Sequence, residues 1–189
     1  KLYKNGDPFK MSKRAGDFIS AQDLLSEVDK DSIRFMMLYR SNDVEIDFDF
    51  DKVKEKTKDN PVFYVQYAYA RINSLLRTLN TRFVEKIEFD EIDFTLNEME
   101  EKIIRKVFEW PKIIESASKK FDLHKIPFYL YELSTLFHAY WSKGNEDKRY
   151  KFIENEKIKR KEILAIITLV AIVIRNGMGI LDVSLPKKM

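Results

Sequence analysis

The chain has 189 residues, of which 44% are hydrophobic and 34% are charged, with a net charge of +3, two histidines and no cysteine. Such a chain is long enough to bury one good-sized core, and its composition is that of a soluble globular protein. Disulfides and thiolate metal sites are excluded, two histidines do not suggest a zinc site, and the mild charge excludes a nucleic-acid binder that works by charge alone.

The longest apolar run covers residues 163–174 and contains one threonine. A membrane-spanning helix needs about 20 apolar residues, so this run is too short to span and predicts a buried helix. We therefore expect no membrane contact, and the absence of cysteine fits a cytoplasmic protein, which is the location we expect.

The first residues predict a β-hairpin followed by a loop. Asn5-Gly6 is a two-residue turn signal between residues 2–4 and 8–10, which can both extend as strands. Lys10 and Lys13 then flank a small hydroxyl residue on the loop that leaves the hairpin. Mobile ammonium groups there can meet the negative charge that develops on a transferring phosphoryl group. Taken alone, the same spacing also fits a solvated charge cluster.

Two helices and an acidic stretch are expected next. Residues 18–19 predict a short strand, and Ser20 predicts a helix cap because Asp23 stands three positions later, as in a capping box. A second helix is expected at about residues 31–40. Residues 44–51 then alternate apolar and acidic side chains and end at a helix start.

From residue 60 onward, apolar residues recur every three or four positions, which predicts an all-helical bundle. Asn60-Pro61 predicts a helix start, because asparagine is a good cap and proline is accepted at the first helical position. Helices are expected at residues 61–80, 96–119, 127–142 and 155–175. Pro111 should interrupt the second of them, and Asn176-Gly177 should stop the last.

The helix from Pro61 has two faces of different character. Its core stripe consists of Val62, Val65, Tyr69, Ile72, Leu76 and Leu79. Tyr64, Tyr67 and Arg71 lie on the opposite face, where they form a platform able to stack on unpaired bases and contact phosphate. The alternative is that this face packs against a neighbouring helix. His138 lies off the apolar stripe of its own helix, which is typical of a surface residue, and near RNA it could stack or donate a hydrogen bond.

Several stretches, in order along the chain, resemble arginyl-tRNA synthetases. Lys10-Met11-Ser12-Lys13 matches the second signature of class I aminoacyl-tRNA synthetases, and residues 10–18 look like its arginyl version. Asp31-Ser32-Ile33-Arg34 is similar to the Asp-Ala-Leu-Arg motif that names the family's anticodon-binding domain, with two conservative departures. Residues 60–71 resemble the start of that domain, and residues 176–189 resemble its end.

The resemblance implies a mainly α fold in two parts. Residues 59–189 would form a helical anticodon-binding domain of the DALR type. Residues 1–58 would be a small α/β segment at the end of the catalytic domain, carrying the signature loop. The first class I signature, His-Ile-Gly-His, is absent from this sequence. We therefore expect a piece of a longer enzyme, and we expect that the piece alone does not form arginyl-adenylate.

The resemblance also implies an arginine–tRNA ligase, which uses ATP to activate arginine as the adenylate and passes the arginyl group to tRNA(Arg). Lys10 and Lys13 would then be catalytic, and Met11 and Ser12 would complete the site for the ATP phosphates. Mg²⁺ is expected with the ATP, and no protein-bound metal is expected. Arg14 stands where the usual signature has serine, which leaves both lysines in place.

Carried over position by position, Tyr64, Tyr67 and Arg71 match family residues near the anticodon loop. This favours the RNA-binding interpretation of their face. His138 falls in a second contact region, and the C-terminal Met189 would lie close to the same platform. The expected partners are tRNA(Arg), ATP and arginine, and the expected state is a monomer.

The residues alone leave three alternatives open. The first is another class I synthetase such as the cysteinyl enzyme, against which residues 60–71 argue. The second is a stand-alone RNA-binding helical module with a vestigial signature loop. The third is a helical protein-interaction domain, in which Tyr64 and Tyr67 pack on a protein helix.

Overall fold

The computed structural model describes residues 1–4, 6–9, 20–79, 95–155 and 157–189. Lys10, Met11, Ser12 and Lys13, which are predicted to hold the ATP phosphates, lie outside the described residues. The strand expected at residues 18–19 also lies outside them.

The N-terminal part contains a small mixed sheet. Strands β1 (Leu2–Lys4) and β2 (Asp7–Phe9) form the predicted antiparallel hairpin, and Gly6 in its turn has a φ of +80°, which glycine adopts without strain. Strand β3 (Phe48–Asp49) pairs in parallel with β1 on the other side, so the order in the sheet is β2-β1-β3. β3 leads into a short 3₁₀ helix at Lys52–Lys54.

Two helices lie between β2 and β3 in the sequence, α1 (Ala21–Glu27) and α2 (Lys30–Leu38). The predicted capping box of α1 is confirmed, because the Asp23 amide donates to Ser20 Oγ at 3.1 Å and the Ser20 amide donates to Asp23 Oδ2 at 2.8 Å. Asp29 caps α2 by accepting from the Ser32 amide at 2.9 Å. A small core forms where these helices meet the sheet, and its buried residues are Val28, Phe48, Phe50 and Val53.

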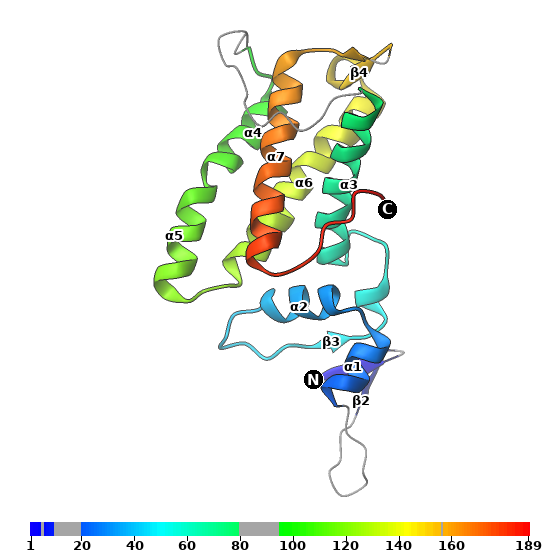
Figure 1. Ribbon diagram of the computed structural model, residues 1–189, viewed down its shortest axis with the longest axis vertical. Helices are drawn as coiled ribbons and strands as arrows, with labels where there is room; N and C mark the ends of the chain where they lie inside the picture. Colours follow the sequence, from blue (N-terminus) through cyan, green and yellow to red (C-terminus); the bar gives the residue numbers. More distant parts are fainter. Residues whose placement is uncertain (5, 10–19, 80–94, 156) are drawn as a thin grey trace, which may run out of the picture.

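The remaining helices form a bundle with its own, larger core. They are α3 (Pro61–Thr78), α4 (Glu98–Phe108), α5 (Trp110–Lys120), α6 (Lys125–Glu146) and α7 (Lys161–Ile180). Figure 1 shows the bundle on one side of the molecule and the sheet with α1 on the other, with α2 between them. Phe35 of α2 is fully buried in the bundle core, so α2 contributes to both cores.

Helix α7 is the most apolar element of the bundle. Among the described residues it is the one helix with the length and composition to cross a membrane, but 61% of that window is buried inside the structure. Ile167, Val170 and Ile174 are each 0% exposed. The run at residues 163–174 therefore forms a core helix, as the sequence predicted.

The bundle differs from the prediction around α7. β4 (Ile153–Glu154) and β5 (Lys157–Ile158) pair antiparallel, and α7 begins only at Lys161. The expectation of an all-helical region from residue 60 and of a helix start at 155 is therefore wrong. The expected stop at Asn176-Gly177 is also wrong, since α7 continues to Ile180. Gly177 has a packing role, because a Cβ there would lie only 2.7 Å from Leu130 Cδ2 of α6.

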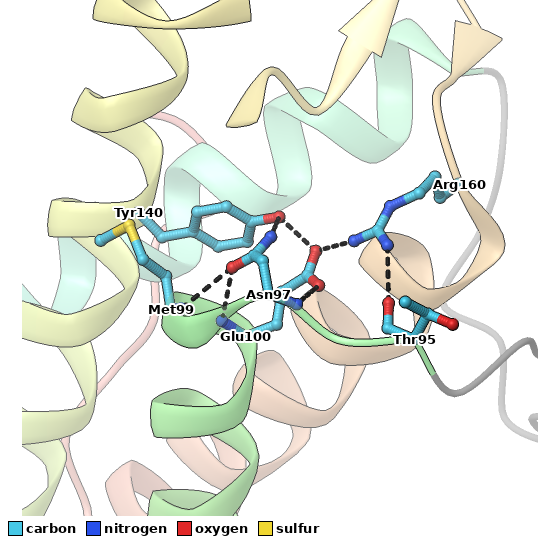
Figure 2. A network of polar contacts seen from close by, with 6 residues as sticks. All are labelled: Thr95, Asn97, Met99, Glu100, Tyr140 and Arg160. Carbon is cyan, nitrogen blue, oxygen red and sulfur yellow. Dashed lines mark hydrogen bonds and ion pairs between the residues drawn. The ribbon is translucent and has the colours of Figure 1, made fainter. Parts of the chain in front are cut away.

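A buried carboxylate ties three of these segments together (Figure 2). Glu100, near the start of α4, is 0% exposed and accepts from the Asn97 amide at 2.9 Å in a capping box. Its other oxygen accepts from the Tyr140 hydroxyl of α6 and from Arg160, the residue before α7. Arg160 also donates to the Thr95 carbonyl at 2.9 Å. The network thus fixes the start of α4 against α6 and α7.

Candidate nucleic-acid interface

The candidate site lies on the face of α3 that is turned away from the core. α3 starts at Pro61 as predicted, but Asn60 makes no capping bond with its side chain. Its side-chain Nδ2 instead donates to the backbone carbonyls of Val53 at 2.8 Å and Glu55 at 2.9 Å. These bonds fix the start of α3 against the 3₁₀ helix and the residue after it, and so set which face of α3 looks outward.

The two faces of α3 are confirmed. Val65 and Ile72 of the predicted core stripe are fully buried, and Tyr69 is 5% exposed. Tyr64, Tyr67 and Arg71 are half-buried on the other side.

On this outer face, Tyr64 has different surroundings from Tyr67 and Arg71. Tyr64 packs on α6, with ring centroids 5.4 Å from Tyr131 and 4.3 Å from His138. Burial, with a smaller effect of Tyr131, raises the pKa of the Tyr64 phenol. Tyr64 therefore packs against a neighbouring helix, as the alternative interpretation expected, whereas Tyr67 and Arg71 line an open hollow.

Arg71 is held by two aromatic rings and by a histidine. Its Cζ lies 4.2 Å from the centroid of the Tyr67 ring and 5.3 Å from that of Trp141 in α6. Its Nη1 lies 3.2 Å from Nδ1 of His138. A cation over aromatic rings is stabilised by their quadrupoles, so the arginine is fixed in place before any ligand arrives.

His138 is not the surface residue that the sequence suggested. It is 4% exposed, because α6 turns it toward α3 and not toward solvent. Its Nε2 lies 3.1 Å from the Tyr64 carbonyl oxygen, and its ring is stacked near Tyr67 at a centroid distance of 5.4 Å. Burial is the main reason that the pKa of His138 falls to about 4, and Arg71 lowers it further. The imidazole is therefore neutral at physiological pH.

The C-terminal tail completes the face. It leaves the end of α7 and runs beside α3, as Figure 1 shows in red. Gln66 donates to the Ser184 carbonyl at 3.0 Å, and Arg77 donates to the Lys187 carbonyl at 2.9 Å. Met189, 55% exposed, thereby comes to the platform of Tyr67 and Arg71, where the resemblance placed it.

Met189 lies between two hollows that share Tyr67. One, of about 380 Å³, is lined by Lys56, Phe63, Tyr67 and Met189. The other, also about 380 Å³, is lined by Tyr67, Ala70, Arg71, Ser74, Arg77, Lys188 and Met189. Among the described residues that line them, four side chains are cationic and none is acidic. Such a surface suits a polyanion that presents flat rings.

Sequence reasoning missed several of these lining residues. Phe63 stacks on Tyr67 with a centroid distance of 5.6 Å, and it precedes Tyr67 by one helical turn. Ser74 follows Tyr67 by two turns. The same helical arithmetic that placed Tyr67 would have found both. Lys56 and Lys188 carried no signal of this kind, because they lie outside α3, before its start and in the tail. Arg77 lies in the last turn of α3 and donates to the tail there.

The motif at residues 31–34 has a clear structural role here. Arg34 donates through Nε to the Leu181 carbonyl, and Asp31 accepts from the Ser184 hydroxyl. Lys30, the preceding residue, pairs with Asp182 at 3.0 Å. The motif thus anchors the beginning of the C-terminal tail to α2. The same tail then runs to α3 and ends at Met189.

Comparison with known protein families identifies a match to the DALR anticodon binding domain over residues 65–189. Among curated proteins, the chain is 50% identical over 189 residues to an arginine–tRNA ligase of Pelagibacter ubique, covering 100% of this chain and 33% of the relative. It is 42% identical over 197 residues to an arginine–tRNA ligase of Rhizobium meliloti, again covering 100% of this chain and 33% of the relative. The chain thus spans a third of the length of these relatives.

Solved structures share the fold. A putative arginyl-tRNA synthetase from Campylobacter jejuni matches with a TM-score of 0.82 and 28% identity, covering 100% of this chain and 39% of that one. Arginyl-tRNA synthetase from Plasmodium falciparum matches with a TM-score of 0.67 and 24% identity, covering 89% of this chain and 28% of that one. At the lower identity the likeness concerns the fold alone.

Proposed function

Since the chain belongs to the family of DALR anticodon binding domains, we propose that it binds the anticodon loop of tRNA(Arg) as part of an arginyl-tRNA synthetase. The observation that carries the proposal is the meeting of Tyr67, Arg71 and Met189 beside one largely aromatic hollow and one cationic hollow. The three residues come from the predicted platform and from the C-terminal end, and the tail brings them together.

The chemistry of this face fits an unpaired RNA loop. The rings of Tyr67 and Phe63 can carry stacked bases, because every base has a π-face. The cations of Lys56, Arg77 and Lys188 can meet backbone phosphates, and such contacts position an RNA without reading its sequence. Arg71, held by Tyr67, Trp141 and His138, offers its remaining N–H groups in a fixed arrangement, which favours recognition of one acceptor pattern over another.

For the whole enzyme we propose the reaction that the curated relatives carry in their name. An arginine carboxylate oxygen bonds to the α-phosphorus of ATP, the bond to pyrophosphate breaks, and a terminal tRNA hydroxyl then attacks the arginyl carbonyl and releases AMP. In this proposal Lys10 and Lys13 stabilise the departing pyrophosphate, while Met11 and Ser12 shape the phosphate site, with Mg²⁺ accompanying ATP. Arginine-dependent exchange of pyrophosphate into ATP by the full-length protein tests this part.

Three further expectations belong to the same proposal. We place the boundary between the catalytic part and the anticodon-binding domain at residues 58 and 59, which is supported by the separate small core around Phe48 and Val53. We also propose that the protein works as a monomer in the cytoplasm.

Exchange of Tyr67 for alanine tests the proposed interface. We expect the affinity for an anticodon stem-loop RNA of tRNA(Arg) to fall by about 1–3 kcal/mol, or roughly fivefold to 150-fold, because one stacking platform is lost. Binding is measured by fluorescence anisotropy of labelled RNA at fixed salt.

Phe108→Ala provides a matched control. Phe108 is 77% exposed at the end of α4, so its loss removes an aromatic ring outside the interface and should leave the affinity unchanged. A folded Tyr67→Ala variant that binds as well as the Phe108→Ala variant would remove Tyr67 from the interface. If the unaltered chain does not prefer this loop to the same stem with another anticodon, the protein-interaction alternative gains.

A further inference from the structure

We propose that His138 is a positioning residue that orients Arg71 for RNA through one neutral tautomer, with its proton on Nε2. The inference rests on the proposed function, since it assigns Arg71 a use in RNA binding. It differs from the sequence-based expectation, in which His138 itself would contact the RNA.

The two partners of the imidazole fix the position of its proton. The Tyr64 carbonyl oxygen, 3.1 Å from Nε2, only accepts hydrogen bonds, so Nε2 must carry hydrogen and donate. The Arg71 guanidinium, 3.2 Å from Nδ1, only donates, so Nδ1 must be bare and accept. Only the neutral Nε2–H tautomer satisfies both contacts.

Charging the ring would disrupt this arrangement. An imidazolium would present an N–H on Nδ1 to the N–H of Arg71 and place two cations side by side. Among the described residues, the titratable groups in hydrogen-bond or ring contact with His138 are Arg71, Tyr64 and Tyr67, all on α3. None of them is an anion at neutral pH, so no ion pair favours the charged form. The bond to the Tyr64 carbonyl favours a proton on Nε2, which the neutral Nε2–H tautomer already carries.

The remaining contacts of Arg71 explain why its orientation matters. Tyr67 and Trp141 both contact the guanidinium, whose Cζ lies 4.2 and 5.3 Å from their ring centroids. Attraction between a cation and a ring does not by itself fix the direction of each N–H group. The bond to Nδ1 is directional, so it fixes one N–H and with it the directions of the others. The Tyr64 bond in turn holds the imidazole to the backbone of α3.

Two substitutions separate the two hydrogen bonds of His138, because each keeps a polar atom at the position of one ring nitrogen. Asparagine places its side-chain oxygen the same number of bonds from Cα as Nδ1, so His138→Asn keeps an acceptor for Arg71. Glutamine places its amide nitrogen at the position of Nε2, so His138→Gln keeps the bond to Tyr64 but loses that acceptor. If His138 acts through Arg71, asparagine should retain most of the RNA affinity. Glutamine should weaken binding about threefold to tenfold, the range of one hydrogen bond.

The double-mutant cycle with Arg71→Ala tests the route of the effect. We expect His138→Gln to change the affinity for the anticodon stem-loop less than twofold when Arg71 is already alanine. An equal loss in both backgrounds would overturn the proposal, because His138 would then act without Arg71. Greater loss for His138→Asn than for His138→Gln would also overturn it.

A spectroscopic measurement on the unaltered chain needs neither a variant nor RNA. The ¹⁵N chemical shifts of the His138 ring near neutral pH should show a protonated Nε2 and a bare Nδ1. An Nδ1–H tautomer or an imidazolium would overturn the positioning role. RNA that fails to bind the unaltered chain would instead overturn the proposed function, and with it the use of Arg71, while the tautomer still decides what His138 does to Arg71.

Discussion

At the scale of single residues, His138 shows how packing changes the chemistry of a side chain. The imidazole loses water when α6 closes on α3, and this desolvation lowers its pKa from 6.5 to about 4. The bond to the Tyr64 carbonyl acts in the other direction, and the charge of Arg71 reinforces the decrease. A histidine that the sequence suggested as a surface residue is thereby buried and neutral over the physiological range.

This lowered pKa predicts how stability changes with pH. Between about pH 6.5 and about pH 4 the unfolded chain binds a proton at His138 that the folded chain does not bind, so the folded state is favoured less as the pH falls. The contribution of His138 to the free energy of unfolding is fully present above about pH 6.5. It is lost as the pH falls toward 4, by up to roughly 3 kcal/mol. Urea unfolding over this range measures it.

The control for this pH dependence is His138→Gln, which has no titrating group at the position. Carboxylates contribute equally to both proteins, so the difference between the two curves isolates the histidine. Stability curves that run parallel from about pH 7 to about pH 4 would contradict the lowered pKa.

At the scale of secondary-structure elements, the network around Glu100 determines how α4, α6 and α7 meet (Figure 2). Glu100 is completely buried, so its carboxylate is stabilised by hydrogen bonds from Arg160, Tyr140 and the Asn97 backbone amide and not by water. The sequence showed only a glutamate in the first turn of a helix. Its burial could not be predicted, because Arg160 arrives from a position 60 residues later in the chain.

Exchange of Arg160 for alanine should destabilise the fold by about 2–3 kcal/mol, since it leaves a buried carboxylate without its cation. The expected loss lies below that of a fully buried pair because the Arg160 side chain is 37% exposed. Arg105→Ala, which removes an exposed pair with Glu101 at 3.7 Å, should cost less than about 0.5 kcal/mol. Urea unfolding compares the two variants through their midpoints, provided that the dependence of the unfolding free energy on urea concentration is unchanged. Equal losses of stability in the two variants would count against the network.

The element boundaries show where sequence patterns suffice. Ser20 with Asp23 marked a helix start correctly because the capping bonds are local. Pro61 did so because its ring fixes a helical φ and the first turn does not need its missing N–H. Gly177 misled, because its lack of a side chain serves the contact with Leu130 and not a helix end. The hairpin of β4 and β5 was missed for a different reason, since strands of two residues are too short to show the alternation of apolar and polar side chains that marks a strand.

At the scale of the whole molecule, the C-terminal tail connects parts that are distant in sequence. It is bound to α2 by Arg34 and Asp31 and to α3 by Gln66 and Arg77. Tyr67 and Arg71 could be predicted as a platform from helical spacing alone. The hollows beside them could not, because they exist only where the tail lies against α3.

Arg34→Ala should loosen this tail without touching the platform. We expect the amides of Leu181, Asp182 and Val183, which donate to carbonyls in the last turn of α7, to exchange hydrogen about threefold to tenfold faster, since one anchoring bond to the Leu181 carbonyl is lost. The affinity for the anticodon stem-loop should fall less than in Tyr67→Ala. Arg40→Ala, an exposed arginine just after the same helix, is the matched control. Unchanged exchange in the Arg34 variant would show that other contacts hold the tail.

The packing of Trp141 against Arg71 has a practical consequence. The chain has two tryptophans, and the other, Trp110, lies in α5 against the ring of Tyr129 at 5.3 Å. Trp141 lies 5.3 Å from the cation proposed to meet RNA, so an approaching phosphate changes the electric field at its indole. The protein thus carries a natural fluorophore next to its candidate interface, and its own emission can report occupancy without any added label.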